Sequence, residues 1–230
     1  MMLLFHYSRL QKLHHQFFFA LFDKFGDQIG TIIMEPQRGV APEKDFLHKI
    51  RDYADKKSIV LIFDEVTSGF HENFGGIHLK LGVNPDLAIF AKAIGNGYPI
   101  STVIGKKSIM DYAQETFISS TMWTERIGFT AALACIKKME EQNAQDKLVE
   151  YGILIKEGWK KAAKESGIKI NVTGLKSIPY FSFENNNSAE LLTFFNQEML
   201  KKGYLTNAGT ATTISYNKNI IDSYLNELTA

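Results

Sequence analysis

Short apolar runs alternate with amphipathic stretches through roughly the first 140 residues, and this alternation constrains the fold more than any other feature of the chain. The apolar runs predict buried strands at 29–34, 58–63, 87–90 and 102–104. The stretches between them have helical periodicity, as where Phe46, Leu47 and Ile50 share one face. Strands that feed crossover helices are typical of a parallel sheet. The sequence therefore predicts an α/β fold with a mostly parallel sheet.

The pattern changes near residue 142, where the alternation becomes that of antiparallel strands with one wet face. The elements predicted here are a helix over 145–166, strands over 168–172 and 178–183, a helix over 189–202 with Ser188 as its N-cap and Gly203 as its stop, and a final helix over 219–228. We therefore expect a large α/β domain over residues 1–142 and a small α+β domain over 143–230.

Composition excludes several classes of partner. With 26 basic and 25 acidic residues and a net charge of +1, the chain has no overall field to attract nucleic acid or an anionic membrane. The apolar stretch at 17–22 is too short to cross a bilayer and lacks the layout of a signal peptide. The single cysteine, Cys135, cannot form an intrachain disulfide and is interpreted as a small core side chain. A cytoplasmic location fits these features.

Asp64 ends the apolar run Leu61-Ile62-Phe63, which predicts a carboxylate at the carboxyl edge of the sheet, where open α/β folds bind ligands. A partner cation, such as a protonated ring nitrogen, would keep a carboxylate ionised there. The alternative is an aspartate that only caps the following turn. Val66 is placed to pack against a flat ring, and its alternative is an ordinary core valine.

Lys92 follows the apolar run Leu87-Ala88-Ile89-Phe90 and precedes Gly95-Asn96-Gly97. Desolvation at this position would lower the pKa of an amine and make it a usable nucleophile. The alternative is a lysine at a strand end that reaches into water. Asp64 and Lys92 together suggest an acid that holds a heteroaromatic nitrogen and a lysine that forms an imine.

Four ordered stretches resemble the class III pyridoxal-phosphate aminotransferases of fold type I, a group that includes glutamate-1-semialdehyde aminomutase. They cover about residues 26 to 136, and the later part of the chain resembles the family's small domain less specifically. The stretches are Met34-Glu35-Pro36-Gln37-Arg38-Gly39, Leu61 to Phe70 around Asp64-Glu65-Val66, Pro85-Asp86 through Lys92 to Pro99, and Ser119-Ser120-Thr121 through Ala131 to Ala134.

The resemblance assigns a role to five residues. It implies that Lys92 forms the Schiff base with pyridoxal 5'-phosphate and that Asp64 pairs with the pyridine nitrogen. Val66 would pack on the cofactor ring. Thr121 matches a threonine that reaches the cofactor phosphate of the neighbouring subunit. Its alternative role is an N-terminal cap for a helix that begins at Glu125, and both roles can hold. Glu35 matches an acid on the cofactor's substrate side, although Glu-Pro is also a common strand exit.

The implied activity is amino-group transfer by an aminotransferase or aminomutase, with Lys92 as the base that moves the substrate's proton. Similarity of the segments 75–78 and 82–86 to the aminomutase branch favours a small amino-acid, amino-aldehyde or amino-sugar substrate. No metal is implied, because His14-His15 and His6 lack a carboxylate or thiol partner.

The chain also departs from the family pattern. The family's amino-terminal half, which carries the phosphate cup and a stacking aromatic residue, has no counterpart here, and His71 stands where an arginine is usual. We therefore expect the carboxyl-terminal portion of a longer enzyme, acting as a homodimer or in association with the missing amino-terminal half. Two alternatives are an inactive remnant or interaction module that kept the fold, and a nucleotide or sugar-phosphate binder, for which Gly95-Asn96-Gly97 is too slight a glycine loop.

Overall fold

The structure is a computed structural model that describes residues 2–5, 11–119, 121–122 and 124–228, with side chains described from residue 18 onward. His6 lies outside the described residues. The chain divides into two compact units, Met1–Gln142 and Asn143–Ala230, and each is described by itself.

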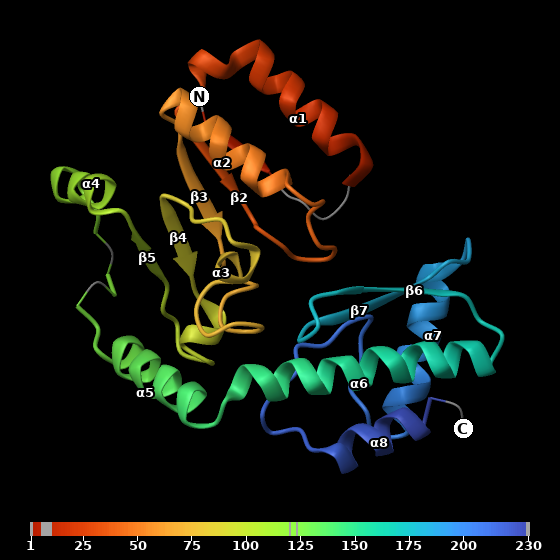
Figure 1. The fold of residues 1–230 in the computed structure, drawn as a ribbon. Coiled ribbons are helices and arrows are strands. Elements are labelled where there is room, and N and C mark those ends of the chain that lie inside the picture. The colour runs from red at the N-terminus through yellow and green to blue at the C-terminus, as the bar shows by residue number, and fades with distance from the viewer. Residues whose placement is uncertain (1, 6–10, 120, 123, 229–230) are drawn as a thin grey trace. The chain divides into compact units, whose positions relative to one another are not determined.

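A five-stranded sheet forms the centre of the first unit (Figure 1). The strands are β1 (Met2–Phe5), β2 (Thr31–Met34), β3 (Val60–Asp64), β4 (Leu87–Phe90) and β5 (Thr102–Gly105), and they lie in this order. Strands β1 to β4 are parallel to their neighbours, whereas β5 runs antiparallel to β4. The predicted α/β fold with a mostly parallel sheet is thus confirmed.

Helices and short helical turns connect these strands. They are α1 (Gln11–Phe25), η1 (Gly26–Gln28), α2 (Phe46–Lys57), α3 (His78–Leu81), η2 (Lys92–Ile94), α4 (Lys107–Met110), η3 (Asp111–Glu115) and α5 (Ile127–Glu141). Figure 1 shows α1 and α2 side by side against β2 and β3. These two helices provide the crossovers that parallel strands require.

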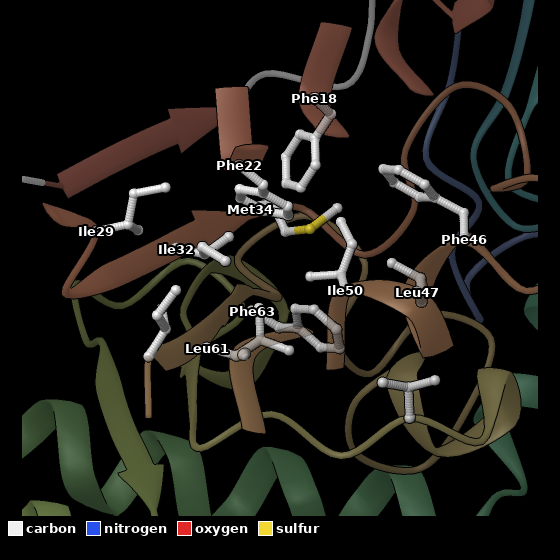
Figure 2. Packing of buried hydrophobic residues seen from close by; sticks show 13 residues of the cluster. Phe18, Phe22, Ile29, Ile32, Met34, Phe46, Leu47, Ile50, Leu61 and Phe63 are labelled. Carbon is white, nitrogen blue, oxygen red and sulfur yellow. The ribbon is translucent and has the colours of Figure 1, made fainter. Parts of the chain in front are cut away.

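The main core of this unit lies between α1, α2 and one face of the sheet (Figure 2). Alternate residues of β2 and β3 point into it, and the pairing of Ile32 with Leu61 and of Met34 with Phe63 sets them in rows. Sheet strands missing from the family fold predict exposed apolar surface that includes Phe17 to Phe19. This prediction is wrong for Phe18, which is buried and packs edge-on against Phe22 and Phe46.

The opposite face of the sheet is less well covered. Ile33, Ile62 and Leu87 lie in one row across β2, β3 and β4, and each is only half-buried. Val103 on β5 pairs with Ile89 in the next row and is 45% exposed. None of these side chains belongs to the buried clusters of the described residues. This face, defined by Ile33, Ile62, Leu87, Ile89 and Val103, is called the open sheet face below.

A smaller cluster joins α5 to the end of β4. Ala132 of α5 packs with Ala88, Phe90 and Ile94. The thiol of Cys135, which is half-buried rather than fully enclosed, donates to the carbonyl of Ala93 at 3.3 Å. Helix α5 is thereby fixed to the turn that begins with Lys92.

The second unit contains two antiparallel strands and three helices, in agreement with the α+β architecture predicted for this part. Its elements are α6 (Ala144–Glu165), β6 (Ile170–Gly174), β7 (Pro179–Phe183), α7 (Ser188–Lys201) and α8 (Lys218–Asn226). The core gathers Ile155, Trp159, Phe181 and Ile221, and the indole of Trp159 donates to the hydroxyl of Tyr224 at 2.8 Å.

The ends of α7 test two predictions. Gly203 stops the helix as expected, because its positive φ of 88° lets the Tyr204 amide turn back to the Met199 carbonyl. The predicted N-cap at Ser188 is wrong by one residue. The helix begins at Ser188, and Asn187 occupies the cap position without a side-chain hydrogen bond to the helix.

No helix among the described residues combines the length and the apolar character needed to span a bilayer.

Candidate functional site

Asp64 is the last residue of β3 and lies at the carboxyl edge of the parallel strands, as predicted. Its side chain is half-buried, and one carboxylate oxygen accepts the amide of Val66 at 3.0 Å. The carboxylate therefore performs the turn-capping role that was considered as the alternative. One bond of this kind leaves it further capacity to accept a proton donor, because an ionised carboxylate has about four lone-pair sites.

Lys92 begins the turn η2 directly after β4, the neighbouring strand. Its backbone has a φ of 49°, in the left-handed region that residues with a Cβ rarely occupy. The ammonium donates to the hydroxyl of Thr67 at 3.0 Å. Lys92 is exposed, so the predicted desolvation of its side chain is wrong for the described residues. The physical reason is its position at the rim of the sheet, outside the cluster that buries the neighbouring Ile94.

Thr67 is a site residue that the sequence analysis did not single out. It follows Asp64 by three residues, so the amine of Lys92 and the carboxylate of Asp64 both contact the turn that follows β3. The available signal was the position of Thr67 in the stretch around Asp64. A lone threonine in a turn is common, however, and only the sheet register brings it to Lys92.

A buried carboxylate fixes the shape of this turn. Glu65 has no exposed surface; one oxygen accepts the Ser68 hydroxyl, and the other contacts the amide and the Nδ1 of His78 at 2.9 and 2.8 Å. The chain also approaches β4 closely, since a Cβ on Gly69 would come within 2.6 Å of the Phe90 ring. These contacts hold the segment that carries Asp64 and Thr67 in one conformation.

His71 lies further along the same segment and is half-buried. Its Nδ1 is enclosed without a hydrogen-bond partner. Burial, together with the positive charge of Lys92, lowers the pKa of His71 to about 4. The imidazole is therefore uncharged at neutral pH and lies within electrostatic reach of the Lys92 amine.

Val66 and Glu35 lie at the ends of neighbouring strands. Val66 is half-buried in the turn after β3 and holds Asp64 through its amide. Glu35 directly follows β2, is buried, and pairs with Arg38 at 3.3 Å. The structure thus places Asp64, Val66 and Lys92 around two adjacent strand ends, with Glu35 at the end of the next strand.

Thr121 lies in an exposed turn before α5. The alternative that it caps this helix is wrong. Helix α5 begins at Ile127, and the carboxylate of Glu125 accepts the amides of Ile127 and Gly128 at 2.8 and 3.2 Å. A carboxylate suits this position because the first amides of a helix have no partners within it.

Two cavities lie elsewhere in the described residues. One of about 200 Å³ is in the second unit and is lined by a mixture of apolar and polar residues, including Trp159, Tyr216 and Tyr224. The other, of about 340 Å³, lies beside Arg51 and Lys106. Neither is lined by Lys92 or Asp64, so the candidate site is identified by the side chains at the strand ends and not by the size of a cavity.

The sequence model of the family described as aminotransferase class-III matches residues 5–220. Among curated proteins, the chain is 32% identical over 179 residues to a glutamate-1-semialdehyde 2,1-aminomutase of Sulfurihydrogenibium sp. (strain YO3AOP1). It is 33% identical over 189 residues to a 3-aminobutyryl-CoA aminotransferase of Cloacimonas acidaminovorans (strain Evry). These matches cover 75% and 79% of this chain but 42% and 44% of the relatives, so the chain spans less than half of their length.

Solved structures show the same fold at lower identity. The chain superposes with a TM-score of 0.86 and 20% identity on the PLP internal aldimine form of the FumI protein from Sphingopyxis sp. MTA144, covering 93% of this chain and 54% of that one. An omega-transaminase from Sphaerobacter thermophilus gives a TM-score of 0.83 at 21% identity, with coverages of 92% and 53%.

Proposed function

The chain belongs to the class-III aminotransferase family, and we propose that it is the carboxyl-terminal portion of a pyridoxal-phosphate-dependent enzyme that transfers an amino group. One observation carries the proposal. The amine of Lys92 and the carboxylate of Asp64 both contact the single turn that follows β3, at the carboxyl edge of a parallel sheet. Open α/β folds bind their ligands at this edge.

The side chains present fit two ends of pyridoxal phosphate. Asp64 offers a half-buried carboxylate for the protonated ring nitrogen, and Lys92 offers an amine for the aldehyde. Val66, between Asp64 and Thr67, is the apolar side chain for the ring. We assign Glu35 to the substrate side, where Arg38 keeps its carboxylate paired. Thr121 is assigned to the phosphate of a neighbouring subunit.

Each residue has a defined task in amino-group transfer. The bound cofactor withdraws electrons from the substrate and so makes its Cα–H bond acidic. Asp64, by staying ionised, keeps a proton on the ring nitrogen, because an adjacent negative charge favours the protonated form. Lys92, as an uncharged amine, removes the proton from the substrate's Cα and returns it. Thr67 and the fixed turn hold the Lys92 amine and the Asp64 carboxylate in place at the carboxyl edge of the sheet.

Substrates of small amino-acid, amino-aldehyde or amino-sugar type fit this chemistry. The first relative named above supports an amino-aldehyde substrate, since it is an aminomutase of a semialdehyde, whereas the second is an aminotransferase of an aminoacyl-CoA. We place the protein in the cytoplasm, in keeping with its single cysteine and its balanced charge.

The open sheet face supports association with a second polypeptide. A half-exposed row of aliphatic side chains on a central sheet is unusual, because sheets with parallel strands are normally covered on both faces. The relatives carry a further half of their length that the chain does not span. We propose that a segment corresponding to this amino-terminal half covers the face and supplies the phosphate contacts.

Reductive labelling tests the function. The purified chain is mixed with pyridoxal phosphate, reduced with borohydride and mapped by peptide mass spectrometry. Lys92 is expected to carry several-fold more label than Lys107 and Lys137, whose side chains are 86% and 76% exposed on helices of the same unit. These two lysines are controls, because their side chains are exposed, as that of Lys92 is, but they lie on helices away from the carboxyl ends of β3 and β4.

The outcomes separate the proposal from its alternative. Label concentrated at Lys92, and lost in a Lys92→Ala variant, supports a cofactor site. Label spread evenly over the three lysines would reject it and favour an inactive remnant or interaction module. The observation that favours this alternative is that Lys92 is exposed and not desolvated.

A further inference from the structure

The hydroxyl of Thr67 connects two turns that follow neighbouring parallel strands. Thr67 lies in the turn after β3, and Lys92 lies in the turn after β4. Their 3.0 Å hydrogen bond joins residues that are 25 positions apart in the chain. The bond therefore acts across the carboxyl edge of the sheet, between the strand that carries Asp64 and the strand that precedes Lys92.

Lys92 has a fixed backbone but a side chain that can adopt many rotamers. The Lys92 carbonyl accepts the amides of Gly95 and Asn96, at 3.1 and 2.8 Å, so its backbone is fixed. Its exposed side chain, however, has four rotatable bonds and many accessible rotamers. The amine needs a fixed partner if it is to stay in one place.

Thr67 is suited to be that partner. Its side chain is β-branched, which restricts rotation about χ1, and it is half-buried. The bonds that Glu65 makes to Ser68 and to His78 fix the turn on which it lies. The fold therefore keeps the hydroxyl oxygen of Thr67 in one position, whichever rotamer the Lys92 side chain adopts.

A hydroxyl also suits both protonation states of an amine. The ammonium of Lys92 donates to the oxygen of Thr67, as the structure shows. After loss of a proton, the uncharged amine has a lone pair and can accept the hydroxyl proton of Thr67 instead. A carboxylate would favour only the charged form, and an apolar side chain would bond neither.

We propose that Thr67 is a positioning residue that holds the amine of Lys92 at the sheet edge beside Asp64 in both its charged and its uncharged form. This inference rests on the proposed role of Lys92 as the lysine that reacts with an aldehyde. In that reaction the uncharged amine adds to the aldehyde carbon, and the carbonyl oxygen leaves as water.

The test uses the full chain and two substitutions. Thr67→Val keeps the branched shape and removes the hydroxyl, whereas Thr67→Ser keeps the hydroxyl. One readout, independent of any cofactor, is the motion of the Lys92 Cε group by NMR on chain with 13C-labelled lysine. In Thr67→Val its order parameter should fall to that of Lys49, an exposed lysine of α2, and in Thr67→Ser it should stay near the wild-type value.

The second readout is the rate of borohydride-trapped labelling of Lys92 by pyridoxal phosphate, measured relative to Lys107 and Lys137 across pH 7 to 10. Loss of one partly exposed hydrogen bond predicts a decrease of about 3- to 10-fold in Thr67→Val, with near wild-type labelling in Thr67→Ser. Circular dichroism of each variant confirms that the fold is retained.

The results distinguish failure of this inference from failure of the proposed function. If wild-type Lys92 is not labelled in preference to the two control lysines, the proposed function is rejected. If it is labelled preferentially but Thr67→Val equals the wild type in both readouts, the positioning role is overturned. Equal loss in Thr67→Val and Thr67→Ser also overturns it, because the hydroxyl would then not be the cause.

Discussion

The pKa of the His71 imidazole is set by its burial and by a neighbouring charge. Its Nδ1 is enclosed without a partner, and both burial and the Lys92 charge disfavour the protonated ring. The two effects act in the same direction, which is why the pKa falls from 6.5 to about 4. Because one of the two causes is the charge on Lys92, loss of that charge should raise the pKa of His71.

Acid should therefore destabilise the fold through His71. Between pH 6.5 and about 4, unfolded His71 binds a proton and folded His71 does not, so the free energy of unfolding falls as the pH drops through this window. The full effect is on the order of 3 kcal/mol. Urea denaturation at pH 7.5 and pH 4.5 measures it, and a His71→Gln variant should lose correspondingly less stability between the two.

Two comparisons sharpen this prediction. His48 is exposed, so His48→Gln should leave the pH dependence of wild type unchanged. Lys92→Met removes the charge that acts on His71, and the NMR titration of the His71 ring should then shift to higher pH. An identical pH dependence in wild type and His71→Gln would contradict the assignment.

At the scale of elements, Asp86 holds the amino-terminal ends of β3 and β4 to α2 and to the end of β5. Its buried carboxylate accepts the amide of Leu61 at 2.7 Å and pairs with Arg51 at 3.0 Å and Lys106 at 2.6 Å. Burial alone would raise the pKa of Asp86, but these donors outweigh burial and hold it below its ordinary value. The strand ends that carry Asp64 and Lys92 thus depend on a buried ion network at the opposite edge of the sheet.

Removing this carboxylate should be costly. Asp86→Ala takes the acceptor from the buried Leu61 amide and one of the two carboxylates from Arg51, and should lower the free energy of unfolding by about 3 kcal/mol. Asp111→Ala is the matched control, since Asp111 is 61% exposed and pairs with Lys107 on the surface; it should cost less than about 1 kcal/mol. Denaturant unfolding at pH 7 compares them, and equal losses would refute a structural role for the network.

At the scale of the whole molecule, the first unit exposes many large apolar side chains, and gathered apolar side chains of this kind are typical of interaction sites. Besides the open sheet face, a stretch before and along α5 is exposed. It contains Phe117, Ile118, Met122, Ile127, Phe129 and Leu133. Thr121, which we assign to a neighbouring subunit's phosphate, lies within this stretch. We propose that this stretch is the contact surface for a second copy of the chain.

Substituting a charge into this stretch should weaken self-association. Leu133 is 72% exposed on α5, so Leu133→Glu should keep the fold and raise the dimer dissociation constant at least 10-fold, as measured by analytical ultracentrifugation. Leu200→Glu, on α7 with 59% exposure, is the control and should have little effect. If neither variant changes the association, α5 does not lie in the interface.

Much of the fold could be predicted from the sequence. Both ends of each of the strands β2, β3, β4 and β5 lie within two residues of the predicted bounds, because each strand is a short apolar run between turn residues. The helix caps were predicted less well. Residue type alone suggests Ser188 and Thr121 as caps, whereas Asn187 and Arg126 occupy the two cap positions and the carboxylate of Glu125 accepts the first amides of α5. Capping depends on where the backbone leaves the helix, which the pattern of side chains does not specify.

The candidate site was only partly predictable. The positions of Asp64 and Lys92 at two strand ends follow from the apolar runs that precede them. The role of Thr67 and the exposure of Lys92 did not follow, because both depend on what packs around two turns that are distant in sequence.

The sequence by itself predicted the strands β2 to β5, the helices of the second unit, the family, and the positions of Asp64 and Lys92 at the ends of two strands. All of these are encoded locally, in hydrophobic period and in short motifs. The tertiary structure decided which side chains meet: that Lys92 contacts Thr67, that His71 lies uncharged near the amine, and that one face of the sheet stays open. Such contacts are set by strand register and by burial, which emerge only when segments far apart in the chain pack together.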